Sequence, residues 1–116
     1  MKKFLAIYLG SSAALDKWKA MDAEKRMEQE KAGKEAWGKW VTVNENSIVD
    51  HGSPVGKTVR ISAQGISDTR NEIGGYIIVQ AESHEAAAKL FENHPHFIIF
   101  PGDSVEVMEC LPMPKV

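Results

Sequence analysis

The sequence contains a single cysteine, Cys110, so no intrachain disulfide can form. No apolar run approaches the ~18 residues that a membrane-spanning helix requires. There is also no large excess of one charge, because 14 Lys and Arg residues against 16 Asp and Glu residues give a net charge of −2. Electrostatics therefore give no reason to expect nucleic acid or a membrane surface as a partner. A lone cysteine fits a protein of the reducing cytoplasm.

The composition is that of an ordinary globular domain, with 43% hydrophobic and 26% charged residues. A chain of 116 residues suits one domain, residues 1–116. Such a domain buries about two-thirds of its unfolded surface, so it folds without a metal or a cofactor, and we expect neither. The N-terminal MKKFLAIYLGSSAAL imitates a signal peptide. Its apolar part ends after only six residues at Gly10, so we predict a strand there instead.

Two segments, Lys3–Leu9 and Tyr76–Ala81, are apolar on both faces and predict strands that are covered on both sides. Residues 13–44 have a helical pattern with a break near Met21-Asp22, and Asp16 and Asp22 are candidate N-caps. Trp37 and Trp40 lie at helical spacing, which is typical of core packing, although they could also stack on a ring-shaped ligand.

The second half of the chain predicts the remaining elements. Residues 47–49 form a brief extended piece, and Thr58–Ser62 alternates as a strand with one wet side does. The polar segment Ala63–Ile73 is expected to be a loop. Ser83 should cap a helix that ends before Pro95. Ser104–Leu111 is the expected last strand.

This order of elements predicts an α+β, ferredoxin-like domain with one antiparallel sheet and two helices on one face. The second face of such a sheet is often wet, but here it is apolar on at least two strands. We therefore predict that two protomers stack sheet on sheet as a homodimer, which is a dimeric α/β barrel.

The motif His94-Pro95-His96 is the main candidate for polar chemistry. In an extended backbone the two imidazoles share one side, which could line a ligand cleft or serve a proton transfer, with Asp103 nearby in sequence. A metal site needs at least a third ligand, so we predict none. The alternative is that the motif ends a helix, with His94 at the negative helix end.

Other candidates are weaker. Asp50 and His51 place a carboxylate beside an imidazole, but adjacent side chains rarely face each other, so a dyad needs another partner. Arg70, in the polar segment, could bind an anion. Cys110 has no basic neighbour in sequence and fits a small buried hydrophobe. Residues 52–58 (GSPVGKT) imitate a P-loop but are one residue short and lead into a strand, so we reject that interpretation.

Taken together and in order, six segments resemble the YCII-related (DGPF-containing) proteins: 37–40 (WGKW), 48–56 (IVDHGSPVG), 74–79 (GGYIIV), 81–88 (AESHEAAA), 94–96 (HPH) and 102–107 (GDSVEV). The resemblance implies a dimeric ferredoxin-like fold in a small cytoplasmic bacterial protein. Some members resemble enzymes with a His/Asp pair in a cleft, for which His94, His96, Asp50 and His51 are the candidates here. Residues 66–72 (ISDTRNE) stand where the DGPF tetrad would fall, which puts any role of that tetrad in doubt.

The sequence thus predicts a homodimeric small-molecule-binding or accessory domain, with a cleft near His94, His96 and the Ala63–Ile73 segment. The residues expected to contact a ligand are Asp50, His51, Arg70, His94 and His96. One alternative is an enzyme that uses His94 or His96 as general acid or base, aided by Asp103 or Asp50. The other is a purely structural assembly partner.

Overall fold

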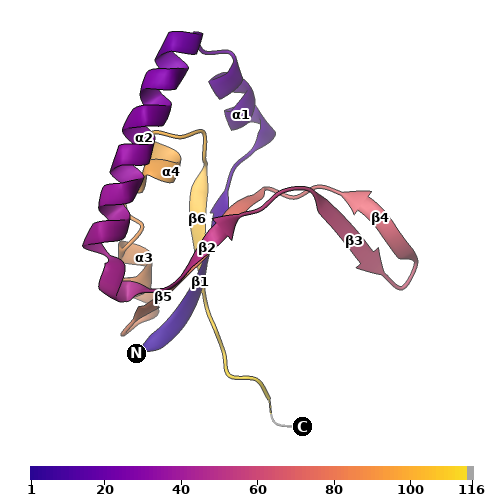
Figure 1. Ribbon diagram of the computed structural model, residues 1–116. Helices are drawn as coiled ribbons and strands as arrows, with labels where there is room; N and C mark the ends of the chain where they lie inside the picture. The colour runs from indigo at the N-terminus through magenta and orange to yellow at the C-terminus, as the bar shows by residue number, and fades with distance from the viewer. Residues whose placement is uncertain (115–116) are drawn as a thin grey trace.

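The computed structural model describes residues 1–114 of the chain (Figure 1). Its elements, in order, are β1 (Lys2–Leu9), α1 (Ser12–Lys19), α2 (Ala23–Val43), the 3-10 turn η1 (Glu45–Ser47), β2 (Ile48–Pro54), β3 (Thr58–Ser62), β4 (Gly65–Thr69), β5 (Ile73–Ala81), α3 (His84–Lys89), α4 (Pro95–Ile98) and β6 (Ser104–Glu109). Within residues 1–114, no helix combines the length and the apolar character needed to cross a membrane.

The body of the domain is an antiparallel sheet with strand order β2-β5-β1-β6. In Figure 1, helices α2, α3 and α4 all lie on one side of this sheet. The predicted α+β, ferredoxin-like fold is therefore confirmed.

The core lies between the sheet and these helices. Alternate residues of β1 and β5 are buried there, led by Phe4, Tyr8 and Val79, and Phe91 after α3 joins them. The intervening residues, among them Leu5 and Ile78, face the other side and remain half-exposed. Strand alternation explains this pattern, since successive side chains point to opposite faces. The outer face of the sheet is thus apolar, as the sequence predicted.

The helical segment breaks at the predicted place, but its first cap is different. Ser11, and not Asp16, caps α1: its hydroxyl accepts a hydrogen bond from the Ala14 backbone N–H at 3.1 Å. Asp16 lies inside α1, and Asp22 occupies the N-cap position of α2 without a side-chain hydrogen bond. Ser83 caps α3 as predicted, accepting from the Ala86 N–H at 3.1 Å.

The segment after β2 differs most from expectation. Thr58–Ser62 was predicted to be a sheet strand and Ala63–Ile73 a loop. Instead, β3 and β4 pair with each other as a separate hairpin, here called the arm (58–69). The strand that pairs with β5 at the edge of the main sheet is β2. Gly65 follows the two-residue turn with a φ of +106°, a conformation that glycine adopts without steric cost. Figure 1 shows the arm projecting from the body.

Candidate functional site

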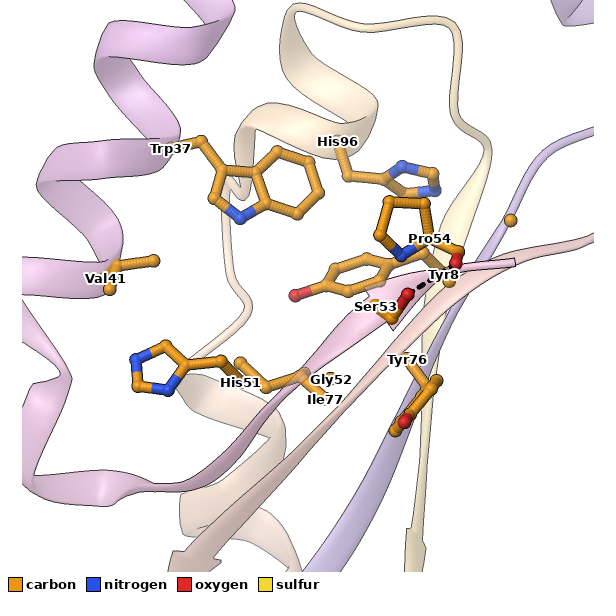
Figure 2. A pocket seen from close by; sticks show the side chains of 12 residues that line it. Tyr8, Trp37, Val41, His51, Gly52, Ser53, Pro54, Tyr76, Ile77 and His96 are labelled. Atoms are coloured by element: carbon orange, nitrogen blue, oxygen red, sulfur yellow. Dashed lines mark hydrogen bonds between the residues drawn. The ribbon is translucent and has the colours of Figure 1, made fainter. Parts of the chain in front are cut away.

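A cavity of about 310 Å³ opens between α2 and the helix-covered face of the sheet (Figure 2). This volume is at the lower end of the range for small-molecule pockets. Strands β1, β2 and β5 form its floor, while α2 and α4 form its walls. The lining residues are Tyr8, Trp37, Val41, His51, Gly52, Ser53, Pro54, Gly74, Gly75, Tyr76, Ile77 and His96.

An irregularity in β2 shapes the floor of the cavity. The register with β5 shifts between Asp50 and Ser53. At this point Gly52 has a φ of +68°, and a Cβ there would overlap the backbone carbonyl of Tyr76. The Asp50 carboxylate holds the turn by accepting a hydrogen bond from the Gly52 N–H at 2.8 Å. Bulges of this kind redirect side chains next to functional sites, and here His51 joins the cavity wall.

Tyr8 borders the cavity and carries an unpaired polar group. Its ring lies 5.0 Å from that of Trp37 and 5.2 Å from that of His96, measured between centroids. Within residues 1–114 its buried hydroxyl has no hydrogen-bond partner. Figure 2 shows that hydroxyl directed into the space between Trp37 and His51. Burial raises the pKa of Tyr8, so the phenol stays protonated and can donate a hydrogen bond at neutral pH.

His94 is a core residue behind the cavity. It is 0% exposed and is packed edge-on against Trp37 and Trp40, with ring centroids 4.5 Å and 4.7 Å away. Its Nδ1 accepts a hydrogen bond from the His96 backbone N–H at 3.0 Å, which caps α4. One alternative from the sequence placed His94 at the negative end of a helix. This alternative was wrong, because the ring caps the N-terminus of α4.

Two causes keep His94 neutral. Burial, and after it the proximity of His96, lowers the pKa of His94 to about 4. Since Nδ1 accepts a hydrogen bond, the ring proton of the neutral form resides on Nε2. That buried Nε2 has no partner among residues 1–114. A neutral imidazole whose accepting nitrogen is already occupied cannot serve as a general base at neutral pH.

His96 lies in the cavity wall and is oriented by the backbone. Its Nε2 donates a hydrogen bond to the Leu9 carbonyl at 2.8 Å, which leaves Nδ1 as the accepting nitrogen of the neutral ring. Burial lowers the pKa of His96, while hydrogen bonds to the backbone of Leu9 and Ser104 and the charge of Asp103 oppose that shift. These contacts fix the orientation of the His96 ring in the cavity wall.

The imidazole of His51 has a carboxylate partner that the sequence did not indicate. Glu45, in η1, places its Oε2 3.3 Å from the His51 Nε2. Both side chains are 58% exposed, and of the two only His51 lines the cavity. A six-residue separation across a turn and a strand start gives no periodicity that could reveal this pair. Tyr8 was missed for a different reason, because its alternation in β1 predicts only a core residue.

The structure separates the remaining candidates from the cavity. Asp50 supports the β2 turn. Arg70 lies beyond the arm in a neighbouring crevice, which Glu72 and His96 also line. Asp103 accepts a hydrogen bond from the Ser11 N–H at 2.5 Å and is not bonded to either histidine. His51 and His96 thus line the cavity together, with His94 behind it. The part of the Ala63–Ile73 segment that was expected at the cleft forms the arm and its return.

The described residues do not form a metal site. Among residues 1–114, no cluster of three or more His, Cys, Asp or Glu side chains is arranged to hold a metal ion. Any ligand of the cavity would therefore be recognised by aromatic faces, by the Tyr8 hydroxyl and by the histidines.

Comparison with known proteins gives a likeness of fold. No family model matches the sequence, and no curated protein matches it. Among solved structures, 5-chloro-2-hydroxyhydroquinone dehydrochlorinase (TftG) from Burkholderia phenoliruptrix AC1100, in complex with 2,5-dihydroxybenzoquinone, is similar with a TM-score of 0.52 and 17% identity. The match covers 91% of this chain and 90% of that one. It shows that the two proteins share the ferredoxin-like fold.

At3g17210 from Arabidopsis thaliana matches over 100% of this chain and 99% of its own, with 21% identity and a TM-score of 0.41. A superposition of this quality supports no conclusion about the chain. The comparisons therefore establish the fold and leave the function to the geometry of the site.

Proposed function

We propose that the cavity under α2 binds a small planar molecule of one ring that carries hydroxyl or carbonyl oxygens. The observation that carries this proposal is the Tyr8 hydroxyl, which is buried, unpaired within residues 1–114 and directed toward the cavity. A buried donor without a partner costs about 1–3 kcal/mol of stability. A ligand oxygen that accepts a hydrogen bond from the Tyr8 hydroxyl would remove that cost. A phenylalanine at position 8 would have no hydroxyl to bury.

The rest of the lining supports a flat, mainly apolar ligand. The Trp37 indole and the apolar side chains of Val41 and Ile77 offer contact surface, and aromatic faces favour offset or edge-on contacts with a ring. The His96 ring adds further contact surface. The fold neighbour TftG was solved with 2,5-dihydroxybenzoquinone, which makes this compound a suitable first probe.

The test is titration calorimetry with 2,5-dihydroxybenzoquinone, followed by a panel of hydroxybenzoates and phenols. The wild-type protein should bind at least one of these compounds, and Tyr8→Phe should weaken that affinity by about tenfold, the equivalent of one neutral hydrogen bond. The matched control is Tyr76→Phe, because the Tyr76 side chain points away from the cavity in Figure 2. Binding that is insensitive to Tyr8→Phe, or no binding across the panel, would contradict the proposal.

The pair of Glu45 and His51 favours a second candidate, general acid–base catalysis on the bound ring. A carboxylate that holds the His51 Nε2 leaves Nδ1 free to accept a proton, and His51 lines the cavity. This assigns the base to His51 instead of His94, whose ring is neutral and whose accepting nitrogen is already hydrogen-bonded to the His96 N–H. The readout is exchange of the ring hydrogens of 2,5-dihydroxybenzoquinone in D₂O, followed by NMR. Catalysed exchange that Glu45→Gln does not slow would exclude this role for the pair.

We also propose that the protein works as a homodimer in which two sheets stack through their outer faces. Leu5, Ile7 and Ile78 give this face an apolar surface that no helix covers within residues 1–114. Sheets with apolar outer faces are commonly paired in sandwiches about 10 Å thick. This arrangement is the one expected of the YCII-related family, to which we assign the chain as part of the proposal. Sedimentation velocity that shows only monomer at micromolar concentration would contradict it.

A further inference from the structure

The isoleucine and valine side chains of the arm (58–69) all lie on one face, as in a hairpin with one buried face. By the register of β3 and β4, Val59, Ile61 and Ile66 share one face with Asp68, and Ile61 and Ile66 stand directly opposite each other on it. The other face carries Thr58, Arg60, Ser67 and Thr69. Yet Ile61 is 73% exposed and Ile66 is 77% exposed. Asp68 stands at the base of the arm, where its carboxylate lies 3.5 Å from the Lys57 ammonium. Apart from this residue, the alternation is typical of a strand pair with one face against a core.

The arm receives little support from its own chain. Among residues 1–114, β3 and β4 contact each other far more than they contact any element of the body. A two-stranded hairpin alone is at best marginally stable in water, and a stable ribbon needs further strands or a packing partner. The arm therefore lacks, in a single copy, the partner that its apolar face requires.

The overall dimensions indicate how much surface that partner would cover. The accessible surface of the chain is 8398 Å². A compact monomer of 12.8 kDa would expose about 6,300 Å². The excess of about 2,000 Å², to which the extended segment after β6 also contributes, matches the 1,000–2,500 Å² or so that each partner of an obligate homodimer buries. The radius of gyration is 16.3 Å, against about 13 Å for a compact chain of this length.

The direction of the arm identifies the partner. Figure 1 shows the arm extending from the sheet on the side opposite to α2, which is the side of the uncovered outer face. The arm and the outer face of the sheet thus border the same region beside one copy. From this geometry we infer that the arm is a clasp: its apolar face docks on a second copy of this chain that is seated on the outer face of the sheet. This inference rests on the proposed sheet-on-sheet dimer and adds a second contact to it.

The clasp can be tested without disturbing the fold, because its side chains lie outside the core. Ile61→Lys/Ile66→Lys places two charges on the apolar face, and Ser67→Lys/Thr69→Lys places the same two charges on the opposite face as a matched control. Sedimentation velocity over a concentration series gives the dimer dissociation constant for each protein. We expect the first variant to raise that constant at least about tenfold and the control to leave it unchanged. Circular dichroism should show both variants folded.

A further variant distinguishes the clasp from the sheet-on-sheet dimer on which it rests. A third variant, Leu5→Lys/Ile78→Lys, charges the outer face of the sheet. If this variant is monomeric while the arm variant dimerises like the control, the sheet-on-sheet dimer stands and the clasp is overturned. If the wild type itself is monomeric across the series, both are overturned. Weakening by the arm variant and by the outer-face variant, but not by the control, supports both.

Discussion

The body of the domain and the arm are built from the same kind of strand but exist in opposite surroundings. In the body, the sheet and α2 enclose Tyr8 and His94 so completely that two polar atoms are left without a partner within residues 1–114. In the arm, the apolar pair of Ile61 and Ile66 stands in solvent. The first region has buried polar groups without a hydrogen-bond partner in the described residues, and the second has apolar side chains without a packing partner there. We propose that a ligand completes the first region and that a second copy of the chain completes the second.

The largest expected effect compares glycine substitutions in the two regions. Gly52→Ala should lower the free energy of unfolding by about 3 kcal/mol or more, because a positive φ and the Tyr76 carbonyl both exclude a Cβ there. Gly65→Ala, at the arm turn, meets no atom within 4 Å and should cost only about 1–2 kcal/mol, from its positive φ alone. Chemical denaturation measures both. Equal losses would contradict the tight packing of β2 on β5.

The second prediction concerns acid. His94 has a pKa of about 4 in the folded protein against an ordinary 6.5, so between these values the unfolded chain binds a proton that the folded protein does not. Stability should therefore be complete above pH 6.5, fall as the pH drops toward 4, and lose about 3 kcal/mol over that range. His96, whose pKa is also lowered, adds to the same slope.

A pair of variants isolates that slope. His94→Asn keeps a side-chain acceptor for the His96 N–H but cannot titrate, so its melting temperature should be lower at pH 7 and change less between pH 6.5 and 4. His51→Asn removes an exposed histidine and should keep the wild-type slope. If His94→Asn shows the full wild-type slope, then His94 does not cause the acid sensitivity.

The smallest effect is expected for Tyr8→Phe in the absence of ligand. Removing a buried hydroxyl that has no partner should leave the free energy of unfolding unchanged or raise it by up to about 1 kcal/mol. Denaturation with urea measures the difference. A loss of more than 1 kcal/mol would mean that the hydroxyl already has a partner in the free protein, and the main support for the ligand site would disappear.

The sequence predicted the body of this fold well and the arm poorly. Strands β1 and β5 were predictable because their apolar runs are bounded by clear turn residues, and the helix break at Met21-Asp22 and the Ser83 cap follow from local chemistry. The arm was misread because alternation in Thr58–Ser62 indicates a strand but not its partner. The polar β4 residues, without an apolar run, resembled a loop.

The candidate site was only partly predictable, for a related reason. His51 and His96 could be selected by residue type, and the structure places both in the cavity wall. That Asp50, Arg70 and Asp103 lie outside it depends on how β2, the arm and α4 are positioned in space. Tyr8 and Glu45 become candidates only through contacts across the fold, which no sequence spacing records.

The most direct test of the central claim is to map the binding site by NMR. In ¹H–¹⁵N spectra, 2,5-dihydroxybenzoquinone or the best binder of the panel is titrated into the uniformly labelled protein. The ligand site under α2 predicts that shifts concentrate on the Trp37 indole N–H and on the amides of Gly52 and Gly75, while the arm amides of Ile61 and Ile66 remain unchanged. Shifts that instead concentrate on the arm or the outer face of the sheet would contradict the account.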